Sequence, residues 1–299
     1  MRRRSAAVML LRCLPILLAG GCSWLHRGGA SPLSPLSVAG DSVLLEVLFV
    51  RLPPAEIDRY LPLWNDVDEQ QLPIASRQRL AANGFRVGLV ASRLPPLLEG
   101  LLNQEEVPKP TNAPKPPKPA NGERMVDVGK EPTVRGYQRQ VRVGEPREIV
   151  PGQKDPYPQL TVLIRNDDGD VTGEVFKKAK PMFVERVYPT KDGRVRLELL
   201  PEIVYGDPQK QFLPGDDGTL QFQVLPPRKA FDRLRIEATL APGQSLLIGG
   251  RPEHEGSLGS RYFTEPSADG PRQQLLLIRL AQAKDDHLFV DDTADGNGN

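Results

Sequence analysis

The sequence predicts an α+β fold that is mostly β. Proline is abundant, with 31 copies against 9 phenylalanines, 2 tryptophans and 6 tyrosines, which favours edge strands and extended linkers over a helical bundle. Strict alternation of apolar and polar residues recurs in the second half, as in Arg194–Leu199, and a helical pattern is confined to residues 61–102. We expect a small α/β module at 42–103, a Pro/Lys-rich linker at 104–124 and an antiparallel β-rich domain at 125–290.

The N-terminus has the layout of an export signal. Arg2, Arg3 and Arg4 form a cationic head, and an apolar stretch follows from Ala6 to Ala19. This stretch is too short for a spanning helix, which needs roughly 20 apolar residues. We therefore interpret residues 1–21 as a signal peptide.

The end of that segment, Leu18-Ala19-Gly20-Gly21-Cys22, resembles the lipobox of bacterial lipoproteins, with Ala19 where the family usually has leucine. The resemblance implies a diacylglyceryl group on the sulfur of Cys22, cleavage before it and acylation of the new amine. The alternative is an ordinary secretory signal cut near Gly21, which leaves Cys22 as a free thiol. The only other cysteine, Cys13, lies in the segment to be removed, so one N-terminal thiol suits a lipid anchor.

The residues behind Cys22 are interpreted as a tether, 22–41, rich in Gly, Ser and Pro. Ser23 implies sorting to the outer membrane if the lipoprotein resemblance holds. The protein would then face the periplasm of a bacterial envelope.

The module at 42–103 begins with Ser42–Leu52, whose nearly continuous apolar run predicts a buried strand. Leu61–Asn83 is predicted to be largely helical, with Pro73 starting a second helix or kinking the first, and Asn83-Gly84 to act as a C-cap. Phe85–Ala91 is a second strand and Pro95–Leu102 a short helix. Trp64 is expected in the core.

In the linker, prolines alternate with lysines and leave no apolar periodicity, so extended polyproline conformation is expected. Beyond it, Met182–Tyr188 and Arg194–Leu199 flank Asp192-Gly193 and predict a hairpin. Further strands are predicted at 234–240, 245–248 and 274–280. The acidic, glycine-rich tail at 291–299 is expected to be disordered.

A family resemblance rests on three motifs in order: Val195-Arg-Leu-Glu-Leu-Leu-Pro201, Arg235-Ile-Glu-Ala-Thr-Leu and Pro242-Gly-Gln-Ser-Leu-Leu-Ile-Gly-Gly250. They resemble the C-terminal β-domain of secretins over residues 181–280. The stretch between Pro201 and Phe231 is too short for a secretin's membrane wall and gate, so a secretin-like β-domain is expected without the channel. The N-terminal module is similar to uncharacterised lipoproteins of planctomycete-type bacteria.

No catalytic, cofactor-binding or metal-ligating residue is proposed from the sequence, and no cofactor is expected. The histidines are His26, His254 and His287, and His254 between two glutamates is interpreted as an exposed polar turn rather than a metal ligand. Asn166-Asp167-Asp168-Gly169-Asp170 hints at calcium, but it lacks a closing acidic ligand, and a hairpin turn is favoured. A formal net charge of +1 gives no indication of nucleic-acid binding.

Two functions of different class therefore stay open. The preferred one is a non-catalytic, lipid-anchored envelope protein that acts as a scaffold or accessory component of an envelope or secretion-type assembly, with exposed sheet edges as its means of docking protein partners. The alternative is a ligand-binding or hydrolytic lipoprotein whose site is assembled from scattered residues.

Overall fold

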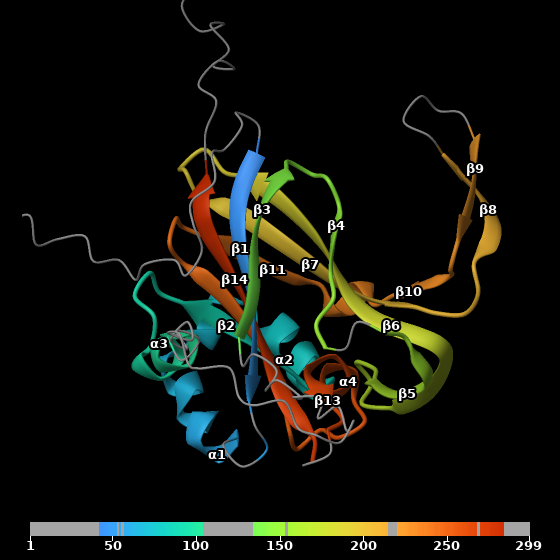
Figure 1. Ribbon diagram of the computed structural model, residues 1–299, viewed down its shortest axis with the longest axis horizontal. Helices are drawn as coiled ribbons and strands as arrows, with labels where there is room; N and C mark the ends of the chain where they lie inside the picture. Colours follow the sequence, from blue (N-terminus) through green and yellow to red (C-terminus); the bar gives the residue numbers. More distant parts are fainter. Residues whose placement is uncertain are drawn as a thin grey trace, which may run out of the picture.

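The computed structural model describes residues 42–52, 54, 57–103, 134–152, 155–214, 220–267 and 270–283. The expected signal peptide, Cys22 with its tether, the linker at 104–124 and the tail at 291–299 all lie outside these residues. Within them the fold is α+β and mostly β, as the sequence predicts (Figure 1). None of the helices in this part of the chain is long and apolar enough to cross a membrane.

The first sheet is antiparallel throughout and is built from both halves of the chain. Its strands, in spatial order, are β2 (Phe85–Val90), β12 (Ser245–Gly250), β14 (Arg272–Ala283), β1 (Ser42–Leu52) and β3 (Val134–Arg142), and β13 (Thr264–Glu265) pairs with β14. The strand predicted at Ser42–Leu52 is therefore confirmed, and it lies in the interior of the sheet between β14 and β3.

This position explains the composition of β1. Val43, Leu45, Val47 and Phe49 face one hydrophobic core, whereas Leu48, Val50 and Leu52 face another on the opposite side of the sheet. Burial on both faces requires an apolar residue at almost every position. Glu46 is a charged residue in the middle of the strand, fully buried and 4.0 Å from the guanidinium of Arg279 on β14.

The helical segments between β1 and β3 lie on both sides of the first sheet. These are α1 (Ile57–Tyr60), η2 (Leu61–Asp66), η3 (Glu69–Gln71), α2 (Ile74–Ala82) and α3 (Pro96–Asn103). Residues of α1, η2 and α3 pack in the smaller core, whereas Leu80 of α2 packs in the larger one. Leu63, Trp64 and Leu98 pack with Leu277 of β14 in the smaller core. Trp64 is thus a core residue, as predicted, and α2 begins directly after Pro73. Gly84 follows α2 with a φ of +79°, which is the left-handed conformation expected after a helix C-terminus.

A second antiparallel sheet packs against the other face of the first and closes the larger core (Figure 1). Its strands are β4 (Arg147–Ile149), β5 (Tyr157–Arg165), β6 (Val171–Pro189), β7 (Val195–Val204), β10 (Arg228–Ala230) and β11 (Ile236–Leu240), with η4 (Asp232–Leu234) between the last two. The predicted hairpin is confirmed, because Tyr188 of β6 pairs with Arg196 of β7 around Gly193, whose φ is +74°.

Two features differ from the sequence analysis. The range 42–103 was expected to form a module of its own, yet both of its strands lie in the sheet that contains β12 and β14. The physical reason is that β1 buries both faces and both edges, so it needs neighbours that its own module lacks. The second feature is a separate two-stranded sheet of β8 (Gln209–Pro214) and β9 (Leu220–Leu225), for which no strands were predicted. It lies between Pro201 and Phe231, the stretch that is too short for a secretin's membrane wall and gate.

Candidate docking site

The outer edge of β5 is covered along only part of its length. One edge of β5 pairs with β6, so alternate residues direct their backbone N–H and C=O groups away from β6. The N–H of Leu163 points this way, since it donates to the carbonyl of Gly256 at 2.8 Å. Because the alternation has a period of two, the backbone groups of Gln159, Thr161 and Arg165 also point outward.

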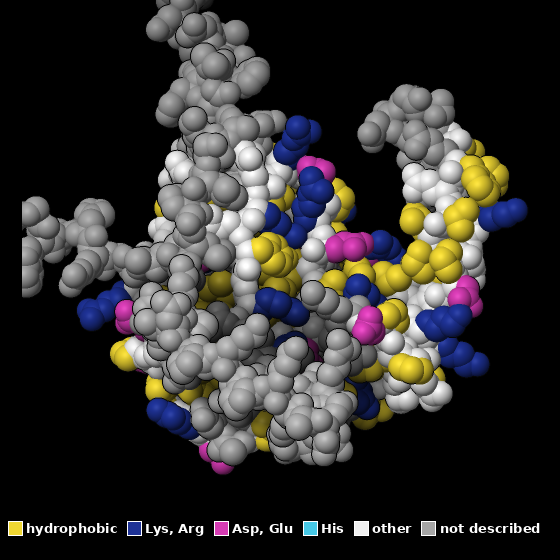
Figure 2. Space-filling model, viewed as in Figure 1, with side chains coloured by type: hydrophobic (Ala, Val, Ile, Leu, Met, Phe, Trp, Pro, Cys, Tyr) yellow, Lys and Arg dark blue, Asp and Glu magenta, His cyan; other side chains and the backbone are white. Residues whose placement is uncertain are grey.

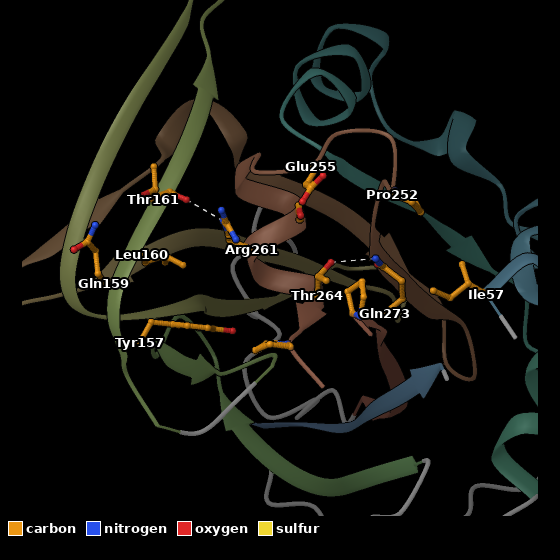
Figure 3. Close-up of a pocket in the computed structure, with 13 residues that line it drawn as sticks. Ile57, Tyr157, Gln159, Leu160, Thr161, Pro252, Glu255, Arg261, Thr264 and Gln273 are labelled. Carbon is orange, nitrogen blue, oxygen red and sulfur yellow. Dashed lines mark hydrogen bonds between the residues drawn. The ribbon is translucent and has the colours of Figure 1, made fainter. Parts of the chain in front are cut away.

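Side chains from distant segments occupy most of these outward groups. The side-chain oxygen of Asn83 accepts from the N–H of Arg165 at 2.9 Å, and the side-chain nitrogen of Asn83 donates to the Arg165 carbonyl at 3.0 Å. The carbonyl of Thr161 accepts from Nε of Arg261 at 2.9 Å (Figure 3). In the part of the chain that the structure describes, no hydrogen bond reaches the N–H of Thr161 or the backbone of Gln159 from outside the sheet.

These open groups border a cleft of about 660 Å³ (Figure 3). Its lining comes from four regions: α1, β5, the segment around α4 (Leu258–Phe263), and the start of β14. Leu160 is almost fully buried beside it, and the lining residues are mostly apolar or uncharged: Ile57, Tyr157, Gln159, Leu160, Thr161, Pro252, Glu255, Ser260, Arg261, Thr264, Pro266, Pro271 and Gln273.

Few charges face the cleft. Arg261 is held on Thr161, and Nε2 of Gln273 donates to the hydroxyl of Thr264 at 3.1 Å. Burial raises the pKa of Tyr157, and the nearby carboxylate of Glu265 raises it further. Tyr157 is therefore a neutral phenol at physiological pH, suited to hydrogen bonding and apolar contact rather than to acid–base catalysis.

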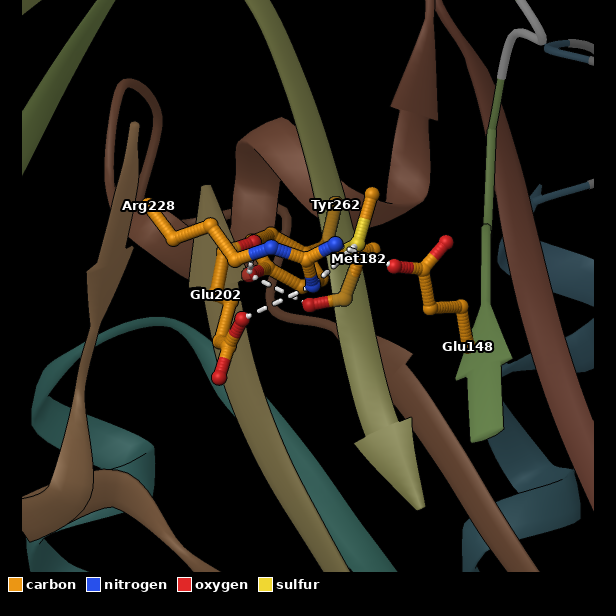
Figure 4. Close-up of polar contacts among 5 residues, drawn as sticks. All are labelled: Glu148, Met182, Glu202, Arg228 and Tyr262. Carbon is orange, nitrogen blue, oxygen red and sulfur yellow. Dashed lines mark hydrogen bonds and ion pairs between the residues drawn. The ribbon is translucent and has the colours of Figure 1, made fainter. Parts of the chain in front are cut away.

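The wall that carries Arg261 is fixed to the second sheet through its neighbour Tyr262. The Tyr262 ring is fully buried against Phe85 and Phe183, with centroids 5.5 and 4.9 Å away. Its hydroxyl lies 2.6 Å from the carbonyl oxygen of Glu202 and 3.0 Å from that of Met182 (Figure 4). Burial raises the pKa of Tyr262 well above its usual value. The helix α4 is thereby tied to β6 and β7.

Arg228 of β10 links three strands of the second sheet (Figure 4). Its guanidinium lies 2.6 Å from the carboxylate of Glu148 on β4 and 3.5 Å from that of Glu202 on β7. Burial lowers the pKa of Arg228, but the carboxylates of Glu148 and Glu202 outweigh it, so the net pKa is raised. These ion pairs connect β10 with β4 and β7 within the second sheet.

The candidate site residues of the sequence analysis do not line this cleft, or they lie outside the residues that the structure describes. Cys22, the proposed lipidation site, is outside the described residues. His254 lies in a turn between β12 and α4, as expected, but its side chain is half-buried rather than exposed. Asp167 and Gly169 lie in the turn between β5 and β6, where the N–H of Asn166 donates to the Asp170 carbonyl at 2.8 Å. The described ranges contain no cluster of His, Cys, Asp or Glu suited to a metal ion.

The sequence analysis predicted docking at sheet edges without naming an edge, and this stays a prediction. The residues that cover β5 are 82 and 100 positions away from their partners in the sequence, and no local pattern reveals such pairs. Comparison with known proteins adds no assignment, because no family model, curated protein or solved structure matches the chain.

Proposed function

We propose that this chain is a non-catalytic, lipid-anchored protein of the bacterial cell envelope that binds an extended segment of a partner protein in the β5 cleft. The observation that supports this most is the open part of the β5 edge, where the backbone of Gln159 and the N–H of Thr161 face the cleft. Adding a strand to such an edge is a common way to bind an extended peptide, since main-chain hydrogen bonds supply affinity and side-chain pockets supply specificity.

The shape of the cleft suits this role. Apolar and proline side chains line it, and Leu160 lies at its base, so apolar side chains of a bound segment would lose contact with water. Glu255 and Arg261 have opposite charges, which favours a partner segment of low net charge. The open edge is only a few residues long, so the segment bound through the backbone is short.

The broader proposal carries the expectations from the sequence. Lipid on Cys22 would hold the protein at a membrane, with the outer membrane favoured, and the cleft would make it a scaffold or an accessory component of an envelope or secretion-type assembly. The secretin-like identity of residues 181–280 stays a prediction.

The test is to block the open edge without disturbing the fold. In Thr161→Pro the lost N–H is one that points away from β6, so the ladder with β6 keeps its hydrogen bonds and the sheet should tolerate the proline. The lipidated protein is extracted gently from its native membrane and the proteins that co-purify are identified by mass spectrometry. We expect Thr161→Pro to lose a partner that the control Thr161→Ala, with the same backbone groups, retains.

Two results would count against the proposal. Equal recovery of partners by Thr161→Pro and Thr161→Ala would exclude strand addition at this edge. An absence of any co-purifying protein with the unaltered chain would remove the scaffold function itself.

A further inference from the structure

The β8–β9 hairpin exposes an apolar face to solvent. Phe212 of β8 and Phe222 of β9 are directly paired, with ring centroids 5.7 Å apart. Leu220 and Val224 lie on the same face, since side chains alternate along a strand. The exposed fractions are 68% for Phe212, 53% for Phe222, 72% for Leu220 and 54% for Val224. In Figure 2 hydrophobic side chains gather along this hairpin where it projects from the body.

A hairpin of this kind is poorly stabilised in water by itself. β8 and β9 form a two-stranded sheet of their own, and isolated two-stranded hairpins are marginal unless a further surface covers their apolar face. Contiguous exposed apolar side chains commonly mark sites of protein or membrane contact. The face formed by Phe212, Leu220, Phe222 and Val224, here called the hairpin face, is therefore expected to have an occupant.

The direction of the hairpin indicates which occupant. β8 and β9 extend toward the same end of the molecule as the start of β1 (Figure 1), and β1 is where the tether from Cys22 enters the fold. We propose that the hairpin face rests in the interface of the lipid bilayer to which Cys22 is anchored. This inference rests on the proposed lipid anchor, and it adds a second, non-covalent contact with the membrane.

The composition of the face fits a bilayer interface. Phenylalanine and leucine are typical of surfaces that enter the headgroup region to about 5–10 Å. Lys210 lies on the same face, with its ammonium 6.0 Å from the centre of the Phe222 ring, so its charged end can reach lipid phosphates while its stem stays on apolar surface. The hairpin face consists of two aromatic rings of roughly 150–250 Å² each and two smaller aliphatic side chains, all partly covered. It therefore falls short of the ~800 Å² per partner of a stable protein interface.

Electrostatic attraction is not the main cause of this contact. Among the described residues on the hairpin face, only Lys210 is charged. We therefore expect the hairpin face to bind zwitterionic bilayers through apolar burial, with little dependence on salt concentration.

The experiment uses two valines of almost equal exposure. Val224 on the hairpin face is 54% exposed and Val175 on β6 is 57% exposed. Each valine is replaced by cysteine in the full lipidated chain, and the new thiol is labelled with an environment-sensitive dye. The sulfur of Cys22 carries the lipid in this chain, so it does not react with the dye. In phosphatidylcholine vesicles we expect the dye in Val224→Cys to shift to the blue and to be at least about fivefold less quenched by aqueous iodide than in Val175→Cys. Adding Phe212→Ser and Phe222→Ser should abolish the difference.

Equal quenching at the two positions in vesicles that carry the protein would overturn the inference while leaving the lipid anchor intact. Failure of the chain to float with vesicles would instead contradict the anchor. The hairpin is then judged with the Cys22→Ser, Val224→Cys chain in excess vesicles, where an unchanged dye spectrum overturns it. Shielding of this dye in buffer without vesicles would point to a second copy of the chain and also overturn it.

Discussion

Replacing Tyr262 with phenylalanine is the most direct test of how the cleft wall is held. The hydroxyl is completely buried and lies 2.6 Å from the Glu202 carbonyl oxygen and 3.0 Å from that of Met182. A hydroxyl has one hydrogen, so the shorter contact is the principal hydrogen bond and the longer one is shared. Removing it leaves buried carbonyls without this donor, which costs about 1–3 kcal/mol in the free energy of unfolding. Urea denaturation followed by circular dichroism measures the loss.

The control is Tyr205→Phe. The Tyr205 ring packs on Phe176 with a centroid distance of 5.1 Å, and within the described chain its hydroxyl makes no hydrogen bond. We expect less than about 0.5 kcal/mol of change there, as for a substitution that removes no buried interaction. A Tyr262→Phe variant as stable as Tyr205→Phe would refute the view that this hydroxyl ties α4 to β6 and β7.

The buried hydroxyl of Tyr262 also predicts that the free energy of unfolding depends on pH in the alkaline range. Burial raises the pKa of Tyr262 in the folded state well above 10, so its stabilising effect is complete below the unfolded pKa of about 10 and is lost as the pH rises through the folded value. Above pH 10 the unfolded chain releases this proton and the folded chain retains it. The unaltered protein should therefore lose stability with pH more steeply than Tyr262→Phe, by up to about 1.4 kcal/mol per pH unit. Parallel curves from pH 9 to 11.5 would contradict this assignment.

Three further perturbations test a buried ion pair, a crowded glycine and the proposed lipid anchor. Arg139→Met leaves the fully buried carboxylate of Glu185 without its ion-pair partner and should lower the free energy of unfolding in urea by about 3–5 kcal/mol. The double variant with Glu185→Leu should recover much of this loss. Additive losses from the two substitutions would argue against an interaction between Arg139 and Glu185. Gly259→Ala places a Cβ 2.2 Å from the Gly84 backbone and should cost at least about 1–3 kcal/mol, whereas Gly100→Ala, in a helix with open space, should gain up to about 1 kcal/mol. Cys22→Ser should release the protein from the membrane fraction, and an unacylated N-terminus in the mass spectrum of the unaltered protein would contradict the lipid anchor.

Local patterns predicted the strands that have clear periodicity. The apolar run of Ser42–Leu52 and the hairpin around Gly193 are both found where expected, because burial on two faces and tight turns leave a signature in consecutive residues. The pairing of β1 with β14 was not predicted, since a strand's neighbours are chosen by contacts across more than 200 positions of sequence. The β8–β9 hairpin was missed although Leu220–Val224 alternates strictly between apolar and polar residues. Alternation predicts a strand with one buried face, whereas the apolar face of this hairpin is exposed.

The candidate site was harder to predict than the fold for a related reason. A docking edge is defined by which backbone groups stay uncovered, and that depends on side chains from elsewhere. Asn83 was interpreted from sequence only as part of a helix cap, and its side chain in fact covers Arg165 of β5. Arg261 gave no local signal at all, although it occupies the Thr161 carbonyl.

The partial covering of the outer edge of β5 explains why the open part of this edge need not cause aggregation. Long exposed edges invite pairing between copies of a protein and hence aggregation. Here Asn83, Gly256 and Arg261 occupy the outward groups at Arg165, Leu163 and the Thr161 carbonyl, which leaves a short open stretch beside the cleft. Such a stretch offers too few hydrogen bonds for a flat sheet edge from another copy, but a narrow segment that also places apolar side chains in the cleft gains both kinds of contact. Selectivity for a single extended segment over a sheet edge would suit the proposed docking function.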